Sequence, residues 1–136
     1  MIALAPGLLL HPAHFSRSKQ EALVEAIRDV VRAAPLFTPT MPRTGKPFSV
    51  RMTNCGPLGW VSDRDGGYRY QAAHPETAEP WPAMPPALIE AWENLGGFAA
   101  PPEACLVNFY AADARMGLHV DADEQDVTAH PQHRCD

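Results

Sequence analysis

The 136-residue sequence lacks several features that mark particular classes of protein. The three cysteines, Cys55, Cys105 and Cys135, form no C-x-x-C pair, so neither a zinc site nor a disulfide framework is predicted. No apolar run approaches a membrane span, and the apolar start MIALAPGLLL lacks the basic region of a signal peptide. No internal repeat is present. We interpret the start as a core strand or an arm, and expect a protein of the reducing cytoplasm.

Proline is abundant, and the basic residues are concentrated in one segment. The fifteen prolines cannot occupy long helices or central strands, so long, stiff loops are expected. The net charge is −5, but segment 40–71 carries five basic residues against two acidic ones, a net of +3 that leaves −8 elsewhere. Such a segment can bind anions or form a solvated loop, and charge alone favours the loop. The bases are Arg43, Lys46, Arg51, Arg64 and Arg69.

Two helices are predicted from apolar periodicity and end signals. Ser18-Lys-Gln-Glu21 is a capping box, and the apolar face that follows it continues to Pro35, which predicts a helix over 19–34. A second helix is predicted to begin at Pro86 and to end at Gly96-Gly97. These signals fix both ends of each helix.

Strands and loops are expected around the helices. The turn-rich stretch Thr53–Trp60 and the five-proline stretch His74–Pro86 are expected to be loops. Ala111–Arg115 is predicted to be a hairpin loop between the last two strands. The predicted strands are 48–53, 68–71, 104–110 and 116–121.

The stretch GLHVDADE carries a candidate metal-binding pair. Alternation along a strand places His119 and Asp121 on one face, roughly 7 Å apart at the backbone, close enough to reach one ion. Asn108 and Tyr110 share a face of the preceding strand, so a hairpin would line one wall with polar groups. Non-haem Fe(II) oxygenases bind iron with two histidines and one carboxylate, and H-x-D supplies two of these three ligands.

The spacing alone is not specific. Six histidines and sixteen acidic residues predict about 0.7 such pairs by chance in a chain of this length. A second pair, His74-Pro75-Glu76, lies in the proline-rich stretch and serves as an internal control. A bare H-x-D is more often a coincidence or a surface pair than a metal site.

Three segments, in order, resemble the AlkB family of Fe(II)- and 2-oxoglutarate-dependent nucleic-acid dealkylases. They are MTNCGPLGWVSDRDGGYRY, PWPAMP and CLVNFYAADARMGLHVDADEQD, and the similarity runs from about Phe48 to Asp126. The resemblance implies an α+β fold with an incomplete double-stranded β-helix (jelly-roll) core, an N-terminal helix and a nucleotide-recognition lid. We expect one domain over 1–136, with the N-terminal part and lid over about 1–100, the start of the core over about 101–126 and an atypical tail over 127–136.

The resemblance also implies roles for individual residues. His119 and Asp121 would bind Fe(II) and form the catalytic centre. Trp60 would stack on the damaged base, where the residues alone would suggest a core aromatic near a turn. The residues expected to contact 2-oxoglutarate are Asn108, Phe109 and Tyr110, and the other expected substrate contacts are Met52, Tyr68, Arg69, Tyr70, Asp123 and Glu124.

The implied reaction removes small alkyl groups from bases by oxidation, consuming O2 and converting 2-oxoglutarate to succinate. The implied partners are alkylated single-stranded or duplex DNA, or RNA, bound by a monomer without membrane contact. In the family, a distal histidine completes the iron site and two arginines after it bind the cosubstrate. Only fifteen residues follow Asp121, and we expect that His130, His133 and Arg134 in the ending VTAHPQHRCD do not replace those groups.

The ending leads to one hypothesis and leaves two alternatives open. A jelly roll needs eight strands, and the sequence offers about five. We therefore hypothesise a chain truncated or frame-shifted after about Asp126, with impaired activity. The alternatives are a non-catalytic nucleic-acid-binding remnant and an unstable fragment without function.

Overall fold

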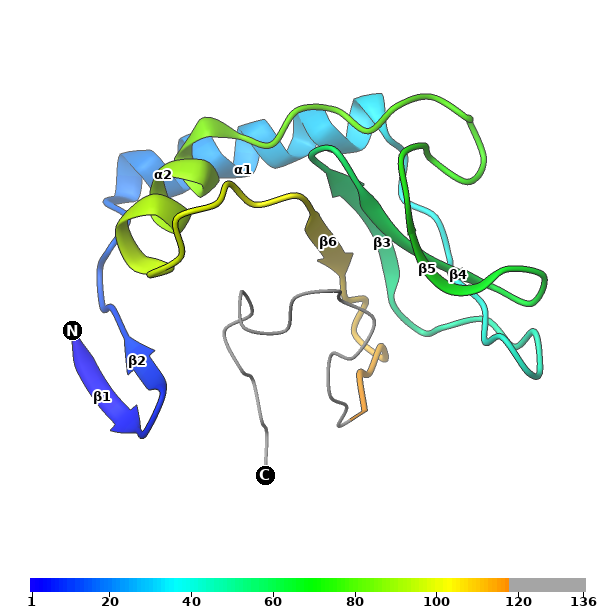
Figure 1. Cartoon of the computed structure of the whole chain (residues 1–136), viewed down its shortest axis with the longest axis horizontal. Coiled ribbons are helices and arrows are strands. Elements are labelled where there is room, and N and C mark those ends of the chain that lie inside the picture. The colour runs from blue at the N-terminus through cyan, green and yellow to red at the C-terminus, as the bar shows by residue number, and fades with distance from the viewer. Residues whose placement is uncertain (118–136) are drawn as a thin grey trace.

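The computed structural model describes residues 1–117, which form two helices and six short strands. The strands pair antiparallel in three two-stranded sheets, β1–β2, β3–β6 and β4–β5. The β1–β2 hairpin lies near the start of α1, and β4–β5 lies toward its other end (Figure 1). In chain order the elements are β1 (Ile2–Ala5), β2 (Leu8–Leu10), α1 (Arg17–Ala33), β3 (Arg51–Cys55), β4 (Gly59–Asp63), β5 (Gly67–Gln71), α2 (Pro86–Leu95) and β6 (Cys105–Phe109).

Both predicted helices are confirmed, with one correction at the start of α1. The side chain of Ser16, not Ser18, caps this helix by accepting a hydrogen bond from the Lys19 N–H at 3.3 Å. Helix α2 begins at Pro86, where a missing N–H costs no intrahelical bond, and Gly96 caps its end. Local end signals therefore locate these helices to within two residues.

Strand β3 is the most deeply buried strand of the described chain. Met52 and Asn54 lie on one face and Thr53 and Cys55 on the other, and all four side chains are buried. The prediction that the turn starts at Thr53 was wrong, because the strand continues to Cys55 before the chain turns at Gly56, where φ is +105°. Polar side chains within this strand are hydrogen-bonded, so burial does not disfavour them.

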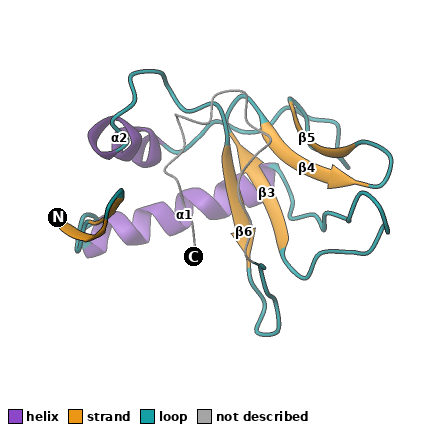
Figure 2. Ribbon diagram, turned by 60° about the horizontal axis from the view of Figure 1, so that its bottom comes forward, coloured by secondary structure: helices purple, strands orange, loops and turns teal. Residues whose placement is uncertain are grey.

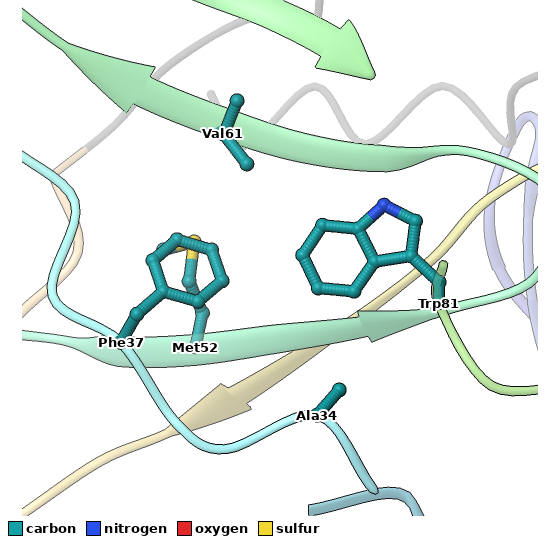
Figure 3. Packing of buried hydrophobic residues seen from close by; sticks show 5 residues of the cluster. All are labelled: Ala34, Phe37, Met52, Val61 and Trp81. Carbon is teal, nitrogen blue, oxygen red and sulfur yellow. The ribbon is translucent and has the colours of Figure 1, made fainter. Parts of the chain in front are cut away.

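Two apolar clusters pack against the opposite faces of β3. The first fills the space between β3 and β4, where the rings of Phe37 and Trp81 lie beside Met52 and Val61 (Figure 3). The second lies on the other face, where β3 and β6 run side by side across α1 (Figure 2). It contains Val30, Cys55 and Met84, flanked by Leu88, Ile89 and Cys105.

The proline-rich segment is a loop, as predicted, and it contributes a core residue. Trp81 is buried, and its indole N–H donates to the carbonyl of Gln71 at 2.9 Å. The indole lies so close to Gly59 that a Cβ there would be 2.2 Å from a ring carbon. The absence of a side chain at Gly59 therefore allows the loop to close over β4.

The N-terminal segment forms a hairpin whose residues are all exposed. Ile2, Leu4 and Leu8 are each 45% exposed or more, so the expectation of a core strand was wrong and the alternative of an arm describes the segment. The predicted α+β content is confirmed. Residues 1–117 contain three two-stranded sheets and do not form a closed eight-stranded jelly roll. Neither of their helices has the length and apolarity needed to cross a membrane.

Candidate functional site

The β4–β5 hairpin presents an aromatic face. Trp60 pairs with Tyr70, and Ser62 pairs with Tyr68, so alternation places these four side chains on one side of the hairpin. The rings of Trp60 and Tyr68 stack with centroids 5.5 Å apart and an interplanar angle of 24°. Phe48 packs at 6.1 Å from Trp60, and Tyr68 is 45% exposed. Trp60 is half-buried and also packs against the first cluster, so the pair is solvent-accessible mainly through Tyr68. A flat aromatic pair with an accessible edge can stack on a nucleic-acid base.

The buried amide of Asn54 holds the backbone of Trp60 from both sides. Its Oδ1 accepts from the Trp60 N–H at 2.9 Å, and its Nδ2 donates to the Trp60 carbonyl at 3.0 Å. Asn54 has no exposed surface. Its side chain therefore joins β3 to β4 in place of a backbone ladder and fixes the strand that carries Trp60. Sequence reasoning missed this residue, which it had assigned to a turn.

Arg69 lies on the opposite face of the hairpin from the aromatic residues. Its guanidinium N–H groups form hydrogen bonds with neighbouring residues of the hairpin. Its guanidinium donates to Asp63 at 2.8 Å, to Gln71 at 2.9 Å and to the Gly67 carbonyl at 3.1 Å. The hydrogen bonds from Arg69 and from the Gly66 N–H lower the pKa of Asp63 below its usual value. These contacts favour a structural role for Arg69 in the β4–β5 turn over the expected contact with substrate.

Three exposed basic residues lie close to the hairpin: Arg64 is in the β4–β5 turn, and Arg43 and Lys46 are in the loop before β3. Arg43, Lys46 and Arg64 form no ion pair within residues 1–117. The two loops are adjacent, since a Cβ on Gly45 would lie 3.5 Å from the Arg64 side chain. Unpaired cations next to an aromatic face can contact the phosphates on either side of a stacked base.

The three residues expected to contact 2-oxoglutarate lie at the end of strand β6 and just after it. All three are exposed to solvent. Asn108 is exposed, Phe109 is 47% exposed beneath the guanidinium of Arg51, and Tyr110 is 51% exposed. The loop after them is held by Ser49, whose hydroxyl donates to the Arg115 carbonyl and accepts from the Arg115 N–H, each at 2.9 Å. Ser49 carries no signal in the sequence. It fixes the chain two residues before GLHVDADE begins.

The histidine of the second histidine–acid pair, the internal control for the spacing, has a structural role. The imidazole of His74 is 2% exposed, and its Nδ1 accepts from the backbone N–H groups of Glu76 and Thr77. Its Nε2 therefore carries the proton and donates to the Pro35 carbonyl at 2.7 Å. Both ring nitrogens are used in holding the proline-rich loop.

The remaining predicted site residues fall into two groups. One of them, Met52, lies in the core, and the others lie outside the residues that the structure describes. Met52 is 1% exposed within the core, so its position does not support the expected contact with a base. Within residues 1–117, no three His, Cys, Asp or Glu side chains gather where they could hold a metal ion. Met116 and Gly117 are not in a strand, and the rest of the predicted strand 116–121 lies outside the described residues. The same is true of His119, Asp121, Asp123 and Glu124.

Comparison with known proteins identifies similar sequences over most of the chain. The profile of the 2OG-Fe(II) oxygenase superfamily matches residues 7–130. The chain is 50% identical over 125 residues to the alpha-ketoglutarate-dependent dioxygenase AlkB homolog of Caulobacter vibrioides, covering 92% of this chain and 56% of that protein. It is 41% identical over 119 residues to AlkB of Escherichia coli, covering 85% of this chain and 54% of the relative. The chain thus spans little more than half the length of these relatives.

Proposed function

Since the chain belongs to the 2OG-Fe(II) oxygenase superfamily and, within it, to the AlkB family, we propose that it takes part in oxidative dealkylation of bases in DNA or RNA. The supporting observation is the stacked pair of Trp60 and Tyr68, with cations that form no ion pair in the β4–β5 turn and in the loop next to it. An enzyme that modifies a base must take it out of the stack and hold it against flat side chains. The aromatic face fits that task.

Two further sets of residues would serve the reaction. His119 and Asp121 would hold Fe(II), and Asn108, Phe109 and Tyr110 would contact 2-oxoglutarate. Fe(II), 2-oxoglutarate and O2 would supply the oxidising chemistry, which would release the alkyl group as an aldehyde and would convert 2-oxoglutarate to succinate and CO2. Asp123 and Glu124 would contact the base edge. We further propose that the protein acts as a monomer in the cytoplasm.

Binding of an oligonucleotide tests the aromatic face. A single-stranded oligonucleotide with one methylated base is titrated into the wild-type chain and into Trp60→Ala. Loss of base stacking is expected to weaken binding roughly 5- to 100-fold. Trp92→Phe is the matched control, because Trp92 lies on α2 and hydrogen-bonds the Ala100 carbonyl, away from β4. Equal affinities of Trp60→Ala and wild type would contradict the proposal.

Turnover tests the proposed reaction separately. The aldehyde and succinate released with Fe(II), 2-oxoglutarate and O2 present are measured for the wild-type chain and for His119→Ala. Product that depends on His119 supports a dioxygenase. Binding of nucleic acid without product favours the alternative of a non-catalytic nucleic-acid-binding protein. That alternative is favoured by one observation: the aromatic face and the cations are complete within residues 1–117.

A further inference from the structure

Two cysteines face each other across the β3–β6 sheet. Cys55 pairs directly with Cys105 in the antiparallel register, so both side chains project from the same face. Residues directly opposite in such a sheet have Cα atoms about 4.5–5.5 Å apart, which lies within the range of disulfides. The Cys55 sulfur lies 3.9 Å from the Cys105 carbonyl oxygen. Forming a bond between the two sulfurs therefore requires side-chain rotation and little movement of the backbone.

The two thiols differ in exposure and in acidity. Cys55 is 1% exposed within the second apolar cluster, whereas Cys105 is half-buried at its edge. A hydrogen bond from the Cys55 thiol lowers the pKa of Cys105 to about 7, and the pKa of Cys55 is raised by that hydrogen bond and by burial. Cys105 is thus the more exposed and the more acidic of the two thiols, and Cys55 is the protected partner.

Neither thiol has another evident role. No metal-binding group of three His, Cys, Asp or Glu side chains includes them within the part of the chain that the structure describes. The proposed substrate contacts and cosubstrate contacts use other residues. A facing pair of one half-buried and one fully buried thiol fits a redox-sensitive site, in which the second thiol resolves the oxidised first thiol.

We propose that Cys55 and Cys105 form a reversible cross-strand disulfide in response to peroxide. The Cys105 thiolate attacks one peroxide oxygen, the O–O bond breaks, and a sulfenic acid and hydroxide form. The Cys55 sulfur then attacks the sulfenic sulfur, the S–O bond breaks, and water leaves with the proton from Cys55. In total, two thiols and one peroxide give one disulfide and two waters, so the sulfurs lose two electrons and the peroxide gains them.

The bond would lock β3 to β6 and close a loop from residue 55 to residue 105. Closing a loop of this length removes conformational freedom from the unfolded chain. The oxidised chain is therefore expected to melt roughly 5–15 °C higher than the reduced chain. Because a reducing compartment would convert the disulfide back to two thiols, the bond would be transient. It would therefore act as a redox signal and not as a permanent structural cross-link.

The test uses the full chain with Cys135→Ser, which leaves both proposed thiols in place. After treatment with hydrogen peroxide, peptides from a non-reducing digest are examined by mass spectrometry. We expect a peptide pair linked through Cys55 and Cys105 that is lighter by two hydrogen atoms and separates on reduction with dithiothreitol. Free thiols at both positions, or sulfinic acid at Cys105 without the linked pair, would overturn the proposal.

Single variants test the order of the steps. In Cys55→Ser, the reaction with peroxide is expected to stop at a sulfenic acid on Cys105, which a dimedone probe captures. In Cys105→Ser, Cys55 is expected to react at least tenfold more slowly than Cys105 does in Cys55→Ser, because Cys55 is buried. Faster labelling of Cys55 than of Cys105 would show that the assigned roles are wrong. In the wild-type chain, a disulfide from Cys105 to Cys135 in place of Cys55 would also contradict the pairing.

Discussion

Replacing Asn54 with alanine should loosen the strand that carries Trp60. The substitution removes two hydrogen bonds, each with a net value of about 1 kcal/mol, and leaves a buried N–H and carbonyl on Trp60 without these partners. Each unsatisfied group costs about 1–3 kcal/mol if water does not reach it. Allowing for partial access of water, we expect Asn54→Ala to lower the free energy of unfolding by about 2–4 kcal/mol.

Urea unfolding measures this loss. The midpoint and slope are followed by far-ultraviolet circular dichroism for the wild-type chain, Asn54→Ala and the control Asn94→Ala. Asn94 is exposed on α2, so its replacement is expected to change stability by less than about 0.5 kcal/mol. The reasoning fails if Asn54→Ala and Asn94→Ala unfold at the same urea concentration.

A second readout separates positioning of Trp60 from general loss of stability. Under conditions where Asn54→Ala stays folded, its affinity for a methylated oligonucleotide should fall toward that of Trp60→Ala. The dependence of affinity on salt should stay unchanged, because it counts the phosphates contacted by basic residues. A changed salt slope would place the effect in the basic loops instead of at Trp60.

Three further substitutions test the packing and charges around the hairpin. Gly59→Ala places a methyl group against the Trp81 indole and is expected to cost about 1–3 kcal/mol in urea unfolding, whereas an unchanged midpoint would show that the loop yields freely. His74→Ala removes the hydrogen bonds that hold the proline-rich loop and should speed its cleavage in limited proteolysis, with equal rates counting against that role. Asp63→Asn weakens the exposed pair with Arg69 and should cost less than about 1 kcal/mol at pH 7. Because folding lowers the pKa of Asp63, this cost should be complete above about pH 5 and should decrease progressively below about pH 4, as the pH falls through the lowered pKa of the folded state; a cost independent of pH would refute the assignment.

The sequence predicted the elements whose limits are set locally. Helix α2 has a proline at its first position and glycine at its cap, and those signals need no tertiary context. The end of strand β3 was misplaced because Asn54 and the Gly56-Pro57 that follows favour a turn, whereas Asn54 and Cys55 are held in the strand by partners elsewhere in the chain. Those partners, Trp60 and Cys105, lie 6 and 50 residues away along the chain.

The candidate site was predicted mainly from the resemblance to the AlkB family. Periodicity alone would place Trp60 and Tyr68 in a core, and their stacking on an accessible face depends on the register of β4 with β5. Met52, by contrast, was expected to contact a base, but both faces of β3 are covered and its side chain lies in the core. Its burial does not support that expected contact. The roles of His119 and Asp121 stay predictions.

Strand β3 connects the proposed base-binding face to the proposed redox pair. Its Asn54 fixes the backbone of Trp60 on one face, while Cys55 faces Cys105 on the other, one residue further along the strand. A disulfide would fix the register of β3 against β6, and the Asn54 amide would transmit that restraint to β4, since buried packing transmits strain. Oxidation should therefore narrow the range of Trp60 positions. Trp60 side-chain NMR order parameters that are equal in the oxidised and reduced Cys135→Ser chain would show that the two faces of β3 are not coupled.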